Sequence, residues 1–157
     1  MQEQLTGGCL CGAIRYVVRG QPSYLTHCHC PTCRKASGAA FLTWLTVRTS
    51  EVEWRGEPLA LYRSSAAVER GFCRRCGTSL TYRHESDPGE IDLTLCSLDQ
   101  PDSLRPEHHT WWEYRLGWAV PEVLANLPTF ARSMEEGRLP PRRRRREHAP
   151  HAEAPLE

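Results

Sequence analysis

Residues 7–12, GGCLCG, and residues 72–77, FCRRCG, each place two cysteines on a short turn that is followed by a glycine. Two cysteines so close on one loop can direct both sulfurs at a single metal ion, at about 2.3 Å for zinc. Gly12 and Gly77 permit the positive φ that turns backbone N–H groups toward the sulfurs. One zinc ion held by both loops would close most of the chain into a structural cross-link. The predicted ligands of this structural site are Cys9, Cys11, Cys73 and Cys76.

Three further cysteines lie within residues 27–35, HCHCPTCRK. Cys28, Cys30 and Cys33 are so close in sequence that one loop can supply all three sulfurs. A zinc ion with three protein thiolates either takes a fourth protein ligand, which makes a second structural site, or keeps one position open for a water or a substrate atom. Spacing alone leaves both alternatives open. The candidates for an internal fourth ligand are His27, His29, His109 and Cys96.

Two residues outside the cysteine set are candidates for substrate contact. Arg34 directly follows Cys33, so its guanidinium either offsets the negative charge of three thiolates, binds a carboxylate of an incoming ligand, or is simply solvated. His109 precedes a pair of tryptophans and is a candidate to line a thiol-substrate pocket, although such residues are more often partly buried packing residues. The eighth cysteine, Cys96, lies in a strand-like run and is expected to be a small buried hydrophobe.

Composition restricts the class of protein. The chain has 157 residues, which is typical of one domain. Its net charge of +1 makes nucleic acid an improbable partner. The start, MQEQLTGG, does not resemble a signal peptide, and no apolar run approaches the roughly 20 residues that a membrane span needs. These features predict a cytoplasmic protein without membrane association, in which clustered cysteines bind metal rather than form disulfides.

The pattern of apolar residues predicts a mainly β protein with few short helices. Runs rich in β-branched and aromatic residues, bounded by glycine and proline, are typical of strands. The predicted strands are residues 13–19, 39–47, 59–63, 79–83 and 91–95. The predicted helices are residues 31–37 and 121–127.

The composition changes near residue 139. Residues 142–146 are five consecutive arginines, followed by a stretch rich in Ala, Pro and His. Such a segment cannot bury enough apolar surface to offset its ordering entropy. We therefore predict a zinc-binding domain over residues 1–138 and a disordered, arginine-rich tail over residues 139–157. If the second metal site is closed, the alternative function is a non-catalytic, zinc-stabilised binding module whose tail contacts an anionic partner.

The cysteine motifs, in this order and spacing, resemble those of the glutathione-dependent formaldehyde-activating family, which also contains centromere protein V. The resemblance covers residues 5 to about 120. It rests on residues 7–16 (GGCLCGAIRY), 28–35 (CHCPTCRK) with Gly38, 72–78 (FCRRCGT), 62–65 (YRSS), Arg70, Leu98-Asp99-x-Pro101 and Pro106-x-x-His109. Cys96 departs from the family pattern, which commonly has glycine at this position.

The resemblance implies a single domain of coiled antiparallel sheets, called a β-tent, with two zinc ions per chain. It implies that the first and last cysteine pairs hold the structural ion. It also implies that Cys28, Cys30 and Cys33 hold a catalytic ion with an exchangeable fourth position. The implied reaction is the condensation of glutathione with formaldehyde to S-hydroxymethylglutathione, a carbon–sulfur lyase reaction in reverse. The implied partner is therefore a small-molecule thiol such as glutathione.

Overall fold

The computed structural model of this chain describes residues 4–127 and residue 129. The chain divides into two units, Met1–Arg115 and Leu116–Glu157, and of the second unit the structure describes residues 116–127 and 129. The predicted boundary at residue 138 and the predicted tail, residues 139–157, lie outside the described residues and stay predictions. Within the described residues, no helix is long and apolar enough to cross a membrane.

The first unit is mainly β, as the sequence predicts. Its strands are β1 (Leu5–Gly8), β2 (Ile14–Val18), β3 (Tyr24–Cys28), β4 (Leu42–Arg48), β5 (Val52–Gly56), β6 (Ala60–Arg63), β7 (Val68–Phe72), β8 (Ser79–His84), β9 (Glu90–Thr94) and β10 (His108–Thr110). Its helix is α1 (Pro31–Ser37), which has the predicted bounds. In the described part of the second unit, α2 (Pro121–Leu124) is shorter than the predicted helix over residues 121–127.

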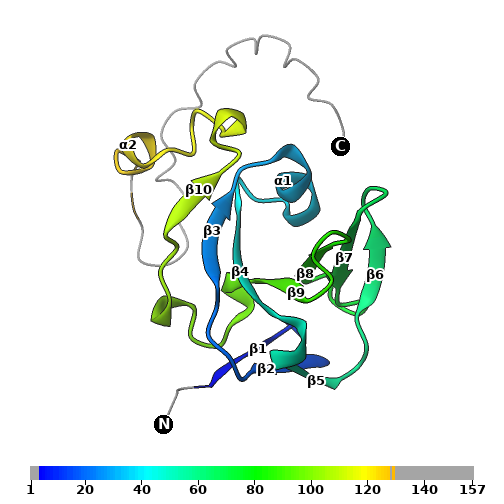
Figure 1. Cartoon of the computed structure of the whole chain (residues 1–157). Coiled ribbons are helices and arrows are strands. Elements are labelled where there is room, and N and C mark those ends of the chain that lie inside the picture. Colours follow the sequence, from blue (N-terminus) through cyan, green and yellow to red (C-terminus); the bar gives the residue numbers. More distant parts are fainter. Residues whose placement is uncertain (1–3, 128, 130–157) are drawn as a thin grey trace. The chain divides into compact units, whose positions relative to one another are not determined.

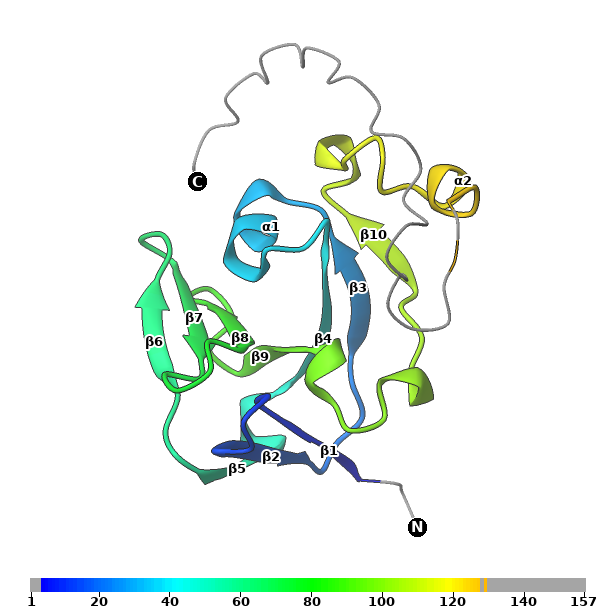
Figure 2. The ribbon, with the colours of Figure 1, turned by 180° about the vertical axis from the view of Figure 1, so that it is seen from behind.

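The strands form two sheets. A three-stranded antiparallel sheet has the order β1-β2-β5, and a seven-stranded sheet has the order β10-β3-β4-β9-β8-β7-β6. Among the described strands, β10 pairs with β3 in parallel, whereas the other neighbouring strands are antiparallel. The small sheet lies across one end of β3 and β4, and the large sheet bends through β9 and β8 toward β7 and β6 (Figure 1). The same bend is visible from behind, with α1 close to the end of β3 (Figure 2).

The two faces of the large sheet carry different cores. Since side chains alternate along a strand, β4 directs Leu45 to one face and Trp44 to the other. Leu45 belongs to the main core between the sheets, which also includes Tyr16 and Leu93. Trp44 is 3% exposed and forms a smaller cluster with Cys28 and Cys33. The cysteines of residues 28–33 therefore lie on the face of the large sheet that points away from the main core.

Candidate metal centres

The first cysteine group is formed by two loops that are distant in sequence. The sulfurs of Cys9, Cys11, Cys73 and Cys76 all lie within 4.8 Å of one another. Cys11 Sγ is 3.6 Å from Cys9 Sγ and 3.8 Å from Cys73 Sγ. Four sulfurs at about 2.3 Å from a tetrahedral ion are separated by about 3.8 Å. The donor type and these separations fit a tetrahedral thiolate site such as that of zinc.

The loops that carry these cysteines have the expected glycine turns. Gly12 and Gly77 both have φ of 75°, a region that is strained for residues with a Cβ. Their N–H groups donate to the carbonyls of Cys9 and Cys73 at 3.0 and 2.8 Å. Ile14 N–H then donates to Cys9 Sγ at 3.2 Å. The backbone thus supplies a hydrogen bond that favours the thiolate.

Thr78 links the two loops by a second contact. Leu10 N–H donates to Thr78 Oγ1 at 3.1 Å, and this oxygen lies 3.2 Å from Cys76 Sγ. The hydroxyl is consequently free to donate to the sulfur. This hydrogen bond is the main cause that lowers the pKa of Cys76 to about 5. A thiolate at neutral pH is the form that binds metal.

The second cysteine group spans the turn from β3 into α1. Cys28 is the last residue of β3, Cys30 is the N-cap of α1, and Cys33 lies in the first turn of the helix. Pro31 restricts the preceding residue to extended backbone, and Cys30 has φ −61° and ψ 147°. Its Sγ accepts a hydrogen bond from Cys33 N–H at 3.2 Å. All three sulfurs lie within 4.8 Å of one another, and within the described residues no other Cys, His, Asp or Glu completes the group.

The four candidates for an internal fourth ligand lie outside this group in the structure. Nδ1 of His27 is 2.8 Å from Thr43 Oγ1. Nε2 of His29 is 2.9 Å from Nδ1 of His109. Cys96 is exposed in a 3-10 turn, so the prediction that it is buried is wrong. Among residues 4–127 and 129, the donor set of the second group is therefore three sulfurs.

The three sulfurs influence each other's ionisation. Hydrogen bonding from Cys28, and then from Cys33, lowers the pKa of Cys30 well below its ordinary value. The same contact with Cys30 is the first cause that raises the pKa of Cys28. One thiolate is thus stabilised by its neighbours, while full ionisation of three adjacent sulfurs requires a nearby cation. This behaviour fits a group that holds a divalent metal ion.

A cluster of histidines and aromatic rings adjoins the second cysteine group. The parallel pairing of β10 with β3 sets His109 opposite His27. The His109 ring lies 5.1 Å from the His29 ring and 4.7 Å from that of Trp112. His29 is 1% exposed, and burial, followed by the neighbouring His109, lowers its pKa. His109 itself is exposed, so the structure brings it beside the cysteine segment where an incoming molecule can reach it.

Arg34 lies in the last turn of α1, immediately after Cys33. Its side chain is partly buried, and among the described residues its Nε has no hydrogen-bond partner. A buried donor without a partner is uncommon in folded proteins and is often explained by a functional role or a bound group. Arg34 therefore remains a candidate substrate contact.

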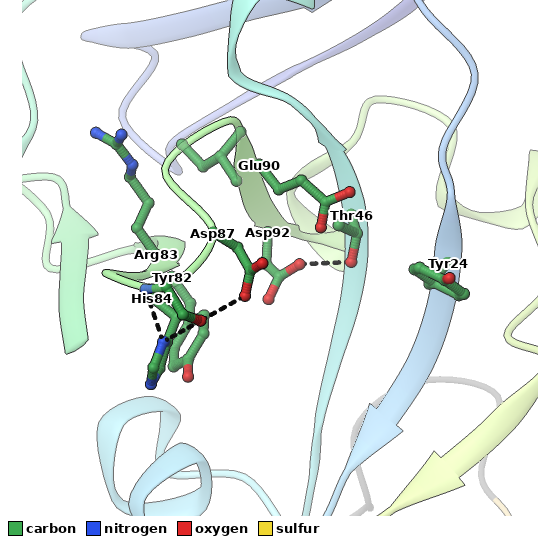
Figure 3. Close-up of a pocket in the computed structure, with 10 residues that line it drawn as sticks. Tyr24, Thr46, Tyr82, Arg83, His84, Asp87, Glu90 and Asp92 are labelled. Carbon is green, nitrogen blue, oxygen red and sulfur yellow. Dashed lines mark hydrogen bonds between the residues drawn. The ribbon is translucent and has the colours of Figure 1, made fainter. Parts of the chain in front are cut away.

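A pocket of about 390 Å³ opens on the face of the large sheet that carries Trp44 (Figure 3). Its floor includes Thr46, Asp92 and Tyr82, which are cross-strand neighbours on β4, β9 and β8. Thr46 Oγ1 donates to Asp92 at 2.5 Å, and burial is the main cause that raises the pKa of Asp92 to about 6. Tyr82 also packs against Trp44, with ring centroids 6.0 Å apart. The pocket thus adjoins the second cysteine cluster, a relationship that no local sequence motif indicates.

The residue pattern alone assigns no role to Arg70, which enters only through the family resemblance. Both of its terminal nitrogens lie near Cys33 Sγ, at 3.8 and 3.7 Å. The one available signal was its position three residues before Cys73, at the start of the third cysteine motif.

Comparison with known proteins gives one family. Residues 4–114 match the family model described as glutathione-dependent formaldehyde-activating enzyme. A Schizosaccharomyces pombe protein named an uncharacterized lyase is 35% identical over 111 residues, which are 61% of this chain and 80% of the relative. A Halomonas elongata protein, provisionally named a glutathione-dependent formaldehyde-activating enzyme, is 33% identical over 136 residues, 81% of this chain and 87% of the relative. A crystal structure of a Rhodobacter sphaeroides protein is similar with a TM-score of 0.54 and 27% identity, and the match covers 67% of this chain and 99% of that one.

Proposed function

Because the chain belongs to the glutathione-dependent formaldehyde-activating enzyme family, we propose that it is a zinc-dependent carbon–sulfur lyase that acts on an adduct of glutathione or a related thiol. The reaction proposed is the reversible combination of glutathione with formaldehyde. The names of the two relatives, a lyase and a formaldehyde-activating enzyme, support this class of reaction.

The two cysteine groups have different proposed roles. Cys9, Cys11, Cys73 and Cys76 would hold a structural zinc ion, since four thiolates complete a tetrahedral site. Cys28, Cys30 and Cys33 would hold the catalytic ion. When bound there, zinc supplies Lewis acidity, which stabilises a thiolate or polarises a carbonyl oxygen at neutral pH.

The chemistry is an addition to a carbonyl group. The thiol sulfur forms a bond to the formaldehyde carbon, one electron pair of the C=O bond moves to oxygen, and the proton lost by the thiol reaches that oxygen. The product, S-hydroxymethylglutathione, contains all the atoms of both reactants. The protein's contribution is to hold the thiol and the aldehyde together in a reactive orientation.

Two residues are proposed to orient the thiol substrate. Arg34 has a partly buried guanidinium whose Nε is free within the described residues, which suits a substrate carboxylate. His109 presents an exposed ring that is held by its 2.9 Å contact with buried His29. Arg34 follows Cys33 directly in the sequence. His109 lies next to the cysteine segment because β10 pairs with β3.

The observation that carries this proposal is the composition of the second group. Three sulfurs converge, and the described residues add no fourth donor to them. A metal ion held by these three sulfurs alone would have a coordination position for a substrate atom, whereas a closed four-ligand group would favour the binding-module alternative.

Exchange NMR tests the proposed activity, because the uncatalysed addition of thiols to formaldehyde is fast and obscures initial rates. The exchange rate between glutathione and S-hydroxymethylglutathione would be measured with the zinc-loaded full chain, with Cys30→Ser and with buffer. Of the three samples, we expect only the wild-type protein to give an exchange rate above that of buffer. Equal rates in all three samples would refute the proposed activity.

A further inference from the structure

Arg70 is a buried arginine that has no carboxylate partner among the described residues. It lies on β7, is 6% exposed, and takes part in none of the ion pairs formed among the described residues. Arginine side chains carry a permanent positive charge in proteins. A buried, permanently charged group is strongly destabilising unless an opposite charge lies close to it.

The contacts of this side chain identify that opposite charge. Nε donates to Ser64 Oγ at 3.1 Å, which fixes the direction of the guanidinium. The guanidinium carbon lies 5.1 Å above the ring centre of Tyr82. The two terminal nitrogens point at Cys33 Sγ from 3.8 and 3.7 Å. Ser64 and Tyr82 are neutral partners, so the sulfur of Cys33 is the contact that can carry a negative charge.

The nearest carboxylate in the same cross-strand row has a different partner. Arg70 pairs with Tyr82 across β7 and β8, and Tyr82 pairs with Asp92 across β8 and β9. The tyrosine therefore stands between the two charged residues. Asp92 accepts its hydrogen bond from Thr46 instead. Tyr82 thus separates Arg70 from Asp92, and the guanidinium of Arg70 contacts the cysteine group instead.

We propose that Arg70 is a positioning residue that supplies the countercharge of the Cys28–Cys30–Cys33 centre and thereby gives it a preference for an anionic fourth ligand. This inference rests on the proposed function, since it assumes a metal ion in that group. A divalent ion with three thiolates carries one net negative charge, which the guanidinium cancels. An anionic thiolate then approaches a neutral centre, whereas without Arg70 it would approach a negative one.

The test compares an anionic and a neutral probe on the same metal. Full-length protein would be loaded with cobalt(II), whose visible absorption reports each new ligand, and titrated with azide and with imidazole. The variants are Arg70→Gln, which removes the charge but keeps a hydrogen-bond donor, and Arg70→Lys, which keeps the charge. Arg63→Gln is the matched control, because Arg63 lies on the neighbouring β6 with 65% of its side chain exposed.

The inference predicts that Arg70→Gln weakens azide binding at least about tenfold more than imidazole binding. Arg70→Lys keeps most of the azide preference, and Arg63→Gln behaves as the wild type. If Arg70→Gln loses affinity for azide and imidazole equally, Arg70 has only a packing role. This result would overturn the inference and leave the proposed function standing. A wild-type centre that responds to neither probe would overturn the proposed open position, and the inference with it.

If Arg70→Gln does not fold, Arg70→Lys becomes the variant that tests the inference. If Arg70→Gln does not retain two cobalt ions per chain, the inference requires Arg70→Lys to retain them and to prefer azide as the wild type does. Loss of the metal or of the azide preference in Arg70→Lys would contradict the charge-based role.

Discussion

Cys11 Sγ lies 3.8 Å from Cys73 Sγ, although 62 residues separate them in the chain. The first cysteine follows β1 of the small sheet, and the second follows β7 of the large one. Cys73 is also fully buried in the main core, whereas Cys28 and Cys33 belong to the small cluster around Trp44. A metal ion in the first group would therefore connect both sheets, and an ion in the second would connect only β3 with α1.

This difference predicts unequal effects of two cysteine substitutions. Cys73→Ser should lower the free energy of unfolding by several kcal/mol, because it removes a ligand of the cross-link and places a hydroxyl in the core. Cys30→Ser should leave the β-sheet circular dichroism and most of the stability intact, while the zinc content falls from two ions to one. Urea unfolding and metal analysis measure both quantities. Equal destabilisation by the two variants would contradict the division into a structural and a catalytic centre.

His109 provides a test of the proposed thiol pocket. His109→Ala should raise the glutathione concentration at half-saturation about tenfold, the effect of losing one hydrogen-bonding contact, without loss of zinc. His108→Ala is the matched control, because it removes the exposed neighbour on the same strand. Saturation of the NMR exchange rate measures both variants. If His109→Ala and His108→Ala reach half-saturation at the same glutathione concentration, His109 does not contact the thiol substrate.

The raised pKa of Asp92 predicts that the effect of Asp92→Asn on the free energy of unfolding depends on pH. Its folded pKa of about 6 is raised from an ordinary 3.8 by burial. The acid therefore favours folding while it is protonated, and this contribution is lost as the pH rises from about 4 through about 6. Asp92→Asn should stabilise the protein more at pH 8 than at pH 5, by on the order of 1 kcal/mol.

Urea unfolding at the two pH values measures this difference. Asp102→Asn, in an exposed turn, controls for general charge effects and for pH-dependent metal loss. The same increment at pH 5 and pH 8 for Asp92→Asn would show that the carboxyl ionises normally in the folded protein.

Tyr16 ties the small sheet to the turn that follows β9. Its buried Oη lies 2.6 Å from Ser97 Oγ, and Ser97 donates its own proton to Thr94 O at 2.7 Å. The tyrosine is thus the donor of this pair. Tyr16→Phe should lower the free energy of unfolding by about 1 kcal/mol, because it leaves Ser97 without that donor. Tyr24→Phe, at an exposed position, should change stability little, and a Tyr16→Phe variant as stable as Tyr24→Phe would contradict the expectation.

The strands predicted from sequence are those with continuous apolar or aromatic runs. Residues 13–19 and 91–95 correspond to β2 and β9, and residues 39–47 correspond to β4, which begins three residues later at Leu42. The strands that were missed are β1, β3, β5, β7 and β10, and of these β7 and β10 lack such runs most clearly. β7, with sequence VERGF, buries Arg70 and Gly71, and β10 consists of three polar residues. β10 pairs with β3, 82 residues earlier in the chain, which local pattern does not reveal. β7 pairs with its chain neighbours β6 and β8, and its strand conformation depends on burial of residues that are usually exposed.

The cysteine groups were predictable because their members lie on short loops with a recognisable spacing. The surroundings of the second group were not. Arg70 reaches Cys33 from 37 residues away, and His109 reaches His29 from 80 residues away. Trp118 is 60% exposed in the second unit, although tryptophan is highly buried on average. Burial and long-range contact are properties of the folded chain, so residue type alone does not assign them.

The most direct test of the open second centre is the visible absorption of the dicobalt protein during titration with glutathione. We expect a saturable spectral change that corresponds to one of the two ions and disappears in Cys30→Ser. A spectrum that stays unchanged at saturating glutathione would mean that the Cys28–Cys30–Cys33 centre does not accept the thiol, and it would contradict the proposed lyase.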